Sequence, residues 1–194
     1  MKNKLITTLI FLCLPLAFAA GEERKTTIGL HILGGGRYDD VRMCVGSPQG
    51  VKGGPIMEVY LDIRIPAGER GTLAVNIPVM RPILFGVAFQ MMQFEPQVTY
   101  EYLFPTGSEK IDIVLGGGLG AVFHYGPDYN SAPEDRGESF FSAGPLFTAS
   151  AGIVFHGRSG NWTPGVKAFY APLFSSGYDN GHVLGGGVEL HYGY

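Results

Sequence analysis

The stretch 183–194 alternates between apolar residues and polar residues or glycine with a period of two, and this pattern restricts the fold more than any other part of the chain. Successive side chains of a strand point to opposite faces, so the alternation predicts a β-strand. Such a strand suits a barrel whose outer surface meets lipid and whose interior is polar. The apolar face carries Leu184, Gly186, Val188, Leu190, Tyr192 and Tyr194.

The rest of the chain divides into similar segments, about eight in all and about ten residues each. The connections between them alternate between long and short, beginning with a long one. Barrels of the outer membrane have short periplasmic turns at one end and longer extracellular loops at the other. We therefore predict an all-β fold, an eight-stranded antiparallel up-and-down transmembrane β-barrel with both mature termini in the periplasm. The predicted strands are 26–36, 56–64, 72–79, 93–103, 110–124, 140–156, 162–173 and 183–194.

The first twenty residues have the three parts of a secretory signal. Lys2 and Lys4 precede an apolar run, and Ala17-Phe18-Ala19 forms a small-residue cleavage site. The run is short for a membrane-spanning helix. We expect residues 1–20 to be a cleaved signal peptide and residues 21–194 to form a single barrel domain.

Composition excludes two classes of protein. Loss of Lys2 and Lys4 lowers the formal net charge from −3 to −5, which leaves no basic face for nucleic acid. Cys13 lies in the signal, so Cys44 is the one thiol of the mature chain and a disulfide framework is excluded. After residue 20 no apolar run has the length and composition of a membrane-spanning helix, so a membrane protein must span with strands.

The chain resembles the small eight-stranded outer-membrane barrels of Gram-negative-type bacteria. The resemblance rests on the signal sequence, the alternation, the loop lengths and the aromatic end of the chain. It implies an outer-membrane location, contact with membrane lipid and a monomeric state. In that class the barrel-assembly machinery recognises the last strand, which implies such a role for Leu190, Tyr192 and Tyr194. The resemblance is architectural and specifies no activity.

The polar faces of the predicted strands collect charged residues in the lumen. An eight-stranded barrel has room there for side chains or for one small ligand. Buried charges must be paired, so we expect the acids to pair with Arg64, Lys110 and Lys167. The predicted lumen network comprises His31, Glu58, Asp62, Arg64, Glu95, Glu101, Lys110, Asp112, Lys167, Glu189 and His191.

The segment 80–92 breaks the alternation and is apolar on all sides. Its position predicts an extracellular connection, where such a segment is unusual. Three interpretations are open: a pair of strands rising above the membrane, a plug over the barrel mouth, and a gate for a hydrophobic ligand. The gate or plug residues would be Ile83, Leu84, Phe85, Phe89, Met91 and Met92.

Catalytic, metal and phosphate sites have weak support in the sequence. Ser150, His156 and Glu189 are the types a hydrolase needs, but the same alternation makes them lumen residues. The five histidines have no metal-ligand spacing. The glycine triplets 34–36 and 185–187 lie inside strands rather than in phosphate loops, and we predict that they meet where the barrel closes. We expect no enzyme activity, metal or cofactor.

The leading functional hypothesis is a structural or surface-binding role through the loops 37–54, 125–138 and 175–181, directed at an unidentified surface ligand. Three alternatives stay open. The first is a narrow channel or binding site for a small apolar solute. The second is an outer-membrane lipid-modifying enzyme. The third is a soluble periplasmic barrel, in which the apolar faces would turn inward.

Overall fold

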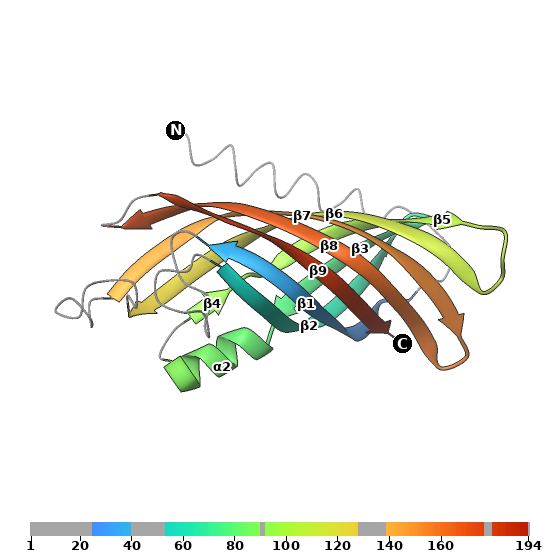
Figure 1. The fold of residues 1–194 in the computed structure, drawn as a ribbon. Helices are drawn as coiled ribbons and strands as arrows, with labels where there is room; N and C mark the ends of the chain where they lie inside the picture. The colour runs from blue at the N-terminus through green and yellow to red at the C-terminus, as the bar shows by residue number, and fades with distance from the viewer. Residues whose placement is uncertain (1–24, 40–52, 90–91, 128–138, 177–179, 194) are drawn as a thin grey trace.

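The computed structural model describes residues 25–39, 53–89, 92–127, 139–176 and 180–193. These residues form an antiparallel barrel with one short helix beside it (Figure 1). The elements are β1 (Thr27–Asp39), β2 (Gly53–Ala67), β3 (Gly71–Pro78), α2 (Met80–Phe89), β4 (Met92–Phe94), β5 (Gln97–Pro105), β6 (Ile111–Pro127), β7 (Ser139–Gly157), β8 (Gly160–Ser176) and β9 (Gly181–Gly193).

Strands β4 and β5 form one interrupted strand of the barrel wall. Both pair with β6 in the same register, since Phe94 is opposite Phe123 and Gln97 is opposite Gly120. The interruption falls at residues 95–96, because proline has no N–H for a ladder hydrogen bond. β1 pairs with β9 and β6 with β7, so the ring closes with eight strands. The predicted eight-stranded up-and-down fold is confirmed.

The two ends of the barrel differ in their connections. At one end, the turn end, short turns join β2 to β3, β5 to β6 and β7 to β8. At the other, the loop end, lie α2 and the connections 40–52, 128–138 and 177–179. Those three connections, the segment 1–20 and Cys44 fall outside the described residues, so predictions about them stay predictions.

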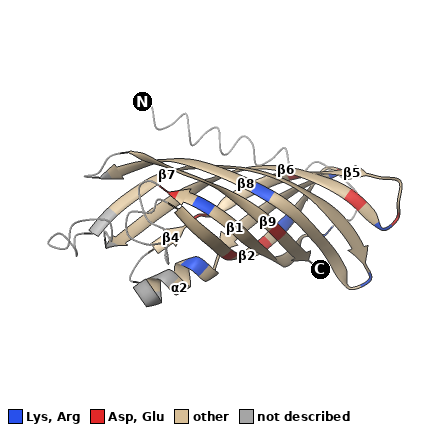
Figure 2. Cartoon of the chain, viewed as in Figure 1, with Lys and Arg blue, Asp and Glu red and all other residues tan. Residues whose placement is uncertain are grey.

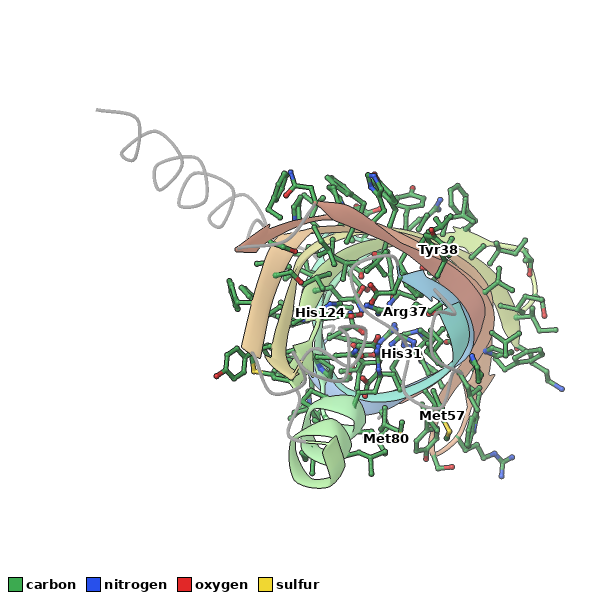
Figure 3. The ribbon with its side chains drawn as sticks, turned by 60° about the vertical axis from the view of Figure 1, so that its left-hand side comes forward. His31, Arg37, Tyr38, Met57, Met80 and His124 are labelled. Carbon is green, nitrogen blue, oxygen red and sulfur yellow. The ribbon has the colours of Figure 1, made fainter. Side chains whose placement is uncertain are left out.

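Apolar side chains face outward around the barrel wall. On β1, Leu30 is 51% exposed whereas the adjacent His31 is fully buried, as alternation of strand faces requires. Figure 3 shows Tyr38 and Met57 outside the ring of strands and His31 inside it. The packing expected of a soluble barrel, with its apolar faces turned inward, is therefore wrong.

The closing seam joins β1 to β9 through glycine. Gly35 is opposite Gly187 and Gly36 is opposite Gly186, so the predicted meeting of the two triplets is confirmed. A Cβ on Gly187 would collide with the backbone of Gly34, and one on Gly35 with the backbone of Gly186. Glycine at these positions allows the first and last strands to approach closely.

The segment 80–92 differs from the prediction. Most of it forms α2, with Met92 beginning β4, so it is not a pair of strands. Figure 3 shows α2 outside the ring of strands, so its described part does not plug the lumen. Ile83 and Leu84 are exposed. The side chains of Phe85 and Phe89, and Met91 as a whole, are outside the described part. No helix in the described ranges is long and apolar enough to cross a membrane.

A carboxylate from the barrel wall caps α2. Glu58 Oε1 on β2 accepts hydrogen bonds from the backbone N–H groups of Met80 and Arg81, each at 3.1 Å, and of Val59 at 2.9 Å. The first N–H groups of a helix have no partner within the helix, and a negative charge there also favours the helix dipole. Glu58 therefore fixes the start of α2 against the barrel.

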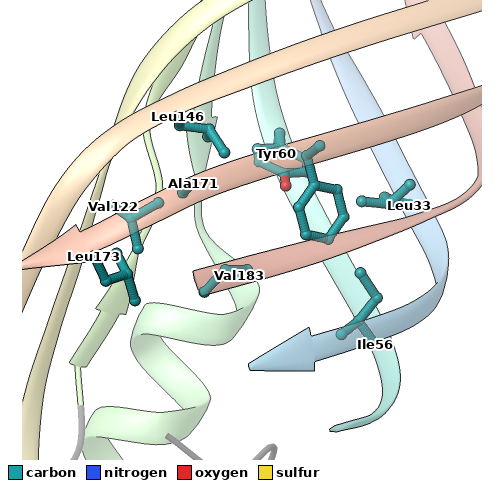
Figure 4. Packing of buried hydrophobic residues seen from close by; sticks show 9 residues of the cluster. Leu33, Ile56, Tyr60, Val122, Leu146, Ala171, Leu173 and Val183 are labelled. Atoms are coloured by element: carbon teal, nitrogen blue, oxygen red, sulfur yellow. The ribbon is translucent and has the colours of Figure 1, made fainter. Parts of the chain in front are cut away.

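The lumen also contains an apolar cluster that the sequence analysis did not predict. Leu33, by its place in the alternation, points inward and is buried. The cluster occupies one side of the lumen toward the loop end (Figure 4). Its members are Leu33, Ile56, Tyr60, Val122, Leu146, Phe169, Ala171, Leu173 and Val183.

Candidate functional site

Two groups of polar side chains lie in the lumen besides the apolar cluster, and Figure 2 shows charged residues along the strands that surround it. Each group links strands that are far apart in the sequence. The turn-side cluster consists of His31, Asp62, Arg64, Asn76, Glu101, Glu189 and His191. The loop-side cluster consists of Arg37, Asp39, Arg81, Gln93, Glu95 and His124.

Arg64 is the cation of the turn-side cluster. Its Nε donates to Asp62 Oδ2 at 2.7 Å. Its two terminal nitrogens donate to the carboxylate oxygens of Glu101 at 2.8 and 3.1 Å, a bidentate pair. Arg64 Nη2 also lies 2.8 Å from Nδ1 of His191. Arg64 therefore pairs with two of the predicted lumen acids, Asp62 on β2 and Glu101 on β5.

Glu189 lies between two stacked histidines in the same cluster. Its Oε2 is 3.0 Å from His31 Nε2 and 3.6 Å from His191 Nε2. The two rings stack with centroids 3.8 Å apart, because His31 and His191 are directly opposite in the β1–β9 register. Nδ1 of His31 lies 3.2 Å from Asn76 Oδ1, and Nδ1 of His191 lies 3.2 Å from Asp62 Oδ2.

Arg37 is the centre of the loop-side cluster. Its guanidinium is fully buried and donates to Glu95 at 2.6 Å and to Asp39 at 3.0 Å. Nη2 also lies 3.0 Å from Nε2 of His124. Arg81 approaches Glu95 at 3.7 Å and donates to Gln93, so α2 is tied into the same network. Figure 3 shows Arg37 and His124 pointing into the barrel.

The two lysines of the predicted network do not form the expected pairs. Lys110 is exposed in the turn before β6, so its assignment to the lumen is wrong. Lys167 is buried, but its Nζ lies 5.3 Å from the centre of the Tyr60 ring and forms no ion pair with a described residue. Asp112 pairs instead with His156, at 2.8 Å.

The side chains considered for hydrolysis do not form a catalytic set in the described part of the chain. His156 pairs with Asp112, and Glu189 contacts the two stacked histidines. No hydrogen bond among the described residues joins Ser150 to His156 or Glu189. The relay of nucleophile, base and carboxylate that such chemistry needs is not assembled there.

A cavity of about 400 Å³ extends into the lumen from the turn end. Glu69 and Arg70, in the turn between β2 and β3, border it at the outside, and Arg64, Glu101 and His191 border it at its inner end. The turn-side cluster is therefore next to a polar space, whereas the loop-side cluster and the apolar cluster are packed.

Comparison with known proteins finds likeness in structure alone. No family model matches the sequence, and no curated protein matches it. The crystal structure of Neisserial surface protein A aligns with a TM-score of 0.56 and 10% identity, covering 86% of this chain and 96% of that chain. The N-terminal β-barrel domain of Pseudomonas aeruginosa OprF aligns with a TM-score of 0.47 and 11% identity, covering 86% of this chain and 97% of that chain. The likeness to Neisserial surface protein A supports the barrel fold.

The loop-side residues Arg37, Asp39 and His124 were not predicted. The first strand was expected to end at residue 36, whereas β1 continues to Asp39. Continuing the alternation from His31 would have placed Arg37 and Asp39 in the lumen, and the face of Asp112 would have placed His124 there. No local pattern indicated the contacts of Arg81, because α2 was not predicted.

Proposed function

We propose that the chain is an integral outer-membrane barrel with a structural or surface-binding role, and that the connections 40–52, 128–138 and 177–179 lie at the cell surface. The observation that carries the proposal is the wall of exposed apolar side chains, because soluble proteins seldom expose apolar patches of such extent. Its most exposed members are Ile28, Met57, Leu119, Val166, Phe174, Leu184 and Val188.

Aromatic side chains at both ends of the wall support a membrane setting. At the turn end Trp162 packs on Tyr192, with ring centroids 4.4 Å apart, and Tyr102 packs on Phe104. Toward the loop end, Tyr38, Tyr125, Phe141 and Phe174 are exposed. Aromatic girdles of this kind lie at the two interfaces of a bilayer. In this proposal the turn end, with both mature termini, faces the periplasm.

The proposed partners during insertion are membrane lipid and the barrel-assembly machinery. Leu190 faces outward and Tyr192 is half-buried against Trp162, while Tyr194 is outside the described residues. An even number of strands puts this C-terminal strand beside β1 at the periplasmic end. We propose that its exposed outer face is the feature that the machinery recognises.

The filling of the lumen favours this role over a channel. The apolar cluster and the buried Arg37–Glu95 pair occupy the loop-side half. Beside Tyr60 and Lys167 a void of about 10 Å³ remains, room for about one water molecule. We expect the refolded protein to give no steady conductance in planar bilayers, and a steady, reproducible conductance would favour the channel alternative.

Electrophoresis with and without boiling tests the membrane barrel. Detergent-refolded protein is expected to migrate differently before and after boiling, because a closed barrel resists unfolding by detergent. The protein should also precipitate when detergent is removed, since its apolar wall is then exposed to water. A folded protein that stays in solution without detergent and shows no mobility shift would contradict the proposal.

Thiol labelling tests which end faces the outside. Cys44 lies in the connection 40–52 and is the one thiol of the mature chain. We expect a membrane-impermeant maleimide to label Cys44 in intact cells. In a Cys44→Ser background, Ser159→Cys places the thiol in the turn between β7 and β8, and labelling should then require disrupted cells. The reverse pattern would invert the proposed orientation.

A further inference from the structure

We propose that His31, His191 and Glu189 form a binding site for a divalent transition-metal ion, with Zn²⁺ as its reference ligand. The site goes beyond the proposed structural and surface-binding role, and the sequence did not indicate it. One donor atom from each of the three buried residues lies within 4.8 Å of the others. Two imidazole nitrogens and a carboxylate oxygen are the ligand types that Zn²⁺ takes in open sites, where water fills the fourth position.

Two of the three donor separations, those to Glu189, suit a common ion, and the two imidazole donors lie within 4.8 Å of each other. Glu189 Oε2 lies 3.0 Å from His31 Nε2 and 3.6 Å from His191 Nε2. Two donors each about 2.1 Å from one ion lie about 3–3.6 Å apart at bond angles of about 90–120°. His31 Nε2 has no partner that meets hydrogen-bond geometry among the described residues, despite its nearness to Glu189. The 3.0 Å contact with Glu189 offsets part of the cost of burying this nitrogen, and an ion would satisfy it fully.

The far nitrogen of each ring has a neighbour that can orient it. His31 Nδ1 lies 3.2 Å from Asn76 Oδ1, and His191 Nδ1 lies 3.2 Å from Asp62 Oδ2. With Nε2 bound to metal, each Nδ1 carries the proton and donates it to that oxygen. Such outer partners fix the tautomer of metal-binding histidines and increase their basicity.

The rings must turn slightly to bind the same ion. Their planes are 16° apart in the stack, so the in-plane lone pairs run nearly parallel instead of converging. The torsion that turns a histidine ring is broad, so this adjustment is inexpensive. Arg64 Nη2 now donates to His191 Nδ1 at 2.8 Å and must move away when that nitrogen is protonated, while Arg64 keeps its bonds to Asp62 and Glu101.

The cavity at the turn end supplies a route and a water ligand. It reaches His191 and Arg64 from the outside and has a volume of about 400 Å³. An ion entering by this path would meet His191 first, since His31 and Glu189 do not line the cavity, and would not cross the packed loop-side half. In the proposed orientation the site is loaded from the periplasm.

Charge gives a second reason to expect a cation. Arg64 is neutralised by Asp62 and Glu101, whereas the contacts of Glu189 are to the two histidines. A buried carboxylate needs a cation or a proton shared with a neighbour. Lys167 interacts electrostatically with both Glu189 and His31, and Arg64 with His191, so both cations oppose a bound metal. A proton shared between Glu189 and a histidine is the competing explanation.

The test is zinc binding by the full mature chain refolded in detergent. After dialysis with Zn²⁺ and removal of free metal, we expect one ion per folded chain, with affinity measured by competition against a coloured chelator. Glu189→Gln should weaken binding at least about 100-fold, because even outer partners of a zinc ligand typically contribute 10–100-fold. Asn76→Leu should weaken it about 10-fold.

Two further variants separate a metal site from loss of structure. His156→Gln removes a histidine from another His–carboxylate pair and should leave zinc affinity unchanged. Lys167→Met removes one of the opposing charges and should increase affinity by roughly threefold or more, which general damage to the barrel would not do. The mobility shift on boiling reports folding of each variant.

Direct location of the ion does not depend on any variant. Anomalous X-ray scattering from crystals grown with Zn²⁺ should place the metal between His31, His191 and Glu189. Absence of bound zinc at a tenfold molar excess, zinc elsewhere in the chain, or binding that Glu189→Gln leaves unchanged would overturn the proposal and favour the shared proton. The membrane barrel and its orientation would stand in each of these cases.

Discussion

Replacing Arg37 by methionine should destabilise the barrel strongly, because it leaves two acids without their shared cation. The Arg37 side chain is fully buried, and its partners Asp39 and Glu95 are 1% and 8% exposed. Removing one partner of a buried ion pair typically costs about 3–5 kcal/mol. Arg81, at 3.7 Å from Glu95, offsets part of the loss at that acid. We therefore expect Arg37→Met to lower the free energy of unfolding by about 3 kcal/mol.

Arg64→Met is the matched comparison. Arg64 also binds two acids, Asp62 and Glu101, but its side chain is 20% exposed and borders the cavity at the turn end. Water can therefore solvate the acids that it leaves behind. We expect a cost of about 1–2 kcal/mol, less than the value expected for Arg37→Met.

Urea unfolding in lipid vesicles measures both effects. The chain has one tryptophan, Trp162, on the outer wall, so its fluorescence reports transfer from lipid to water. The triple variant Arg37→Met, Asp39→Asn, Glu95→Gln should recover part of the stability lost in Arg37→Met, since it removes the two uncompensated acids together with their cation but takes the Glu95 carboxylate from Arg81. Equal costs for Arg37→Met and Arg64→Met, or no recovery in the triple variant, would refute the role assigned to burial.

Three smaller predictions follow from the same contacts. Glu58→Ala should destabilise the start of α2 by about 1–2 kcal/mol, measured as faster hydrogen exchange of its first amides, because the carboxylate that accepts their hydrogen bonds is lost. Gly187→Val should lower the yield of heat-modifiable barrel, whereas Gly34→Ala should not, because a Cβ meets neighbouring backbone at the first position and nothing within 4 Å at the second. Lys110→Ala should change the free energy of unfolding by less than about 0.5 kcal/mol, since its side chain is exposed; a larger loss would show a partner for this lysine.

The faces of the strands could be predicted because they follow from a local rule. Alternation alone placed Asp62, Glu101 and His191 inside the barrel, and the structure buries all three. The same rule misplaced Lys110, because the strand that it was assigned to begins one residue later, at Ile111. It also missed Arg37, because the first strand is longer than its apolar residues indicated.

The contacts inside the lumen depended on the register of the paired strands. A period of two does not fix this register, because a shift of two residues keeps every side chain on the same face. His31 and His191 are far apart in the sequence and meet because β1 and β9 close the ring at one register. If the two glycine triplets meet and both histidines face inward, His31 and His191 must lie at opposite or nearly opposite positions of the two paired strands. Their contact could therefore have been predicted from the glycine seam. Arg64 reaches Glu101 on β5 across β3, which requires the sheet to curve.

What the sequence determined by itself was therefore the barrel class and its inner and outer faces, since both follow from the order of residues along single strands. What only the tertiary structure decided was the set of contacts in the lumen, namely the histidine pair with Glu189 and the Arg37 network, which ties in the helix at 80–89 through Arg81. Each of these depends on residues brought together across the ring. The physical cause of these contacts is the closure and stagger of eight strands, which cannot be predicted from the residues of any single strand.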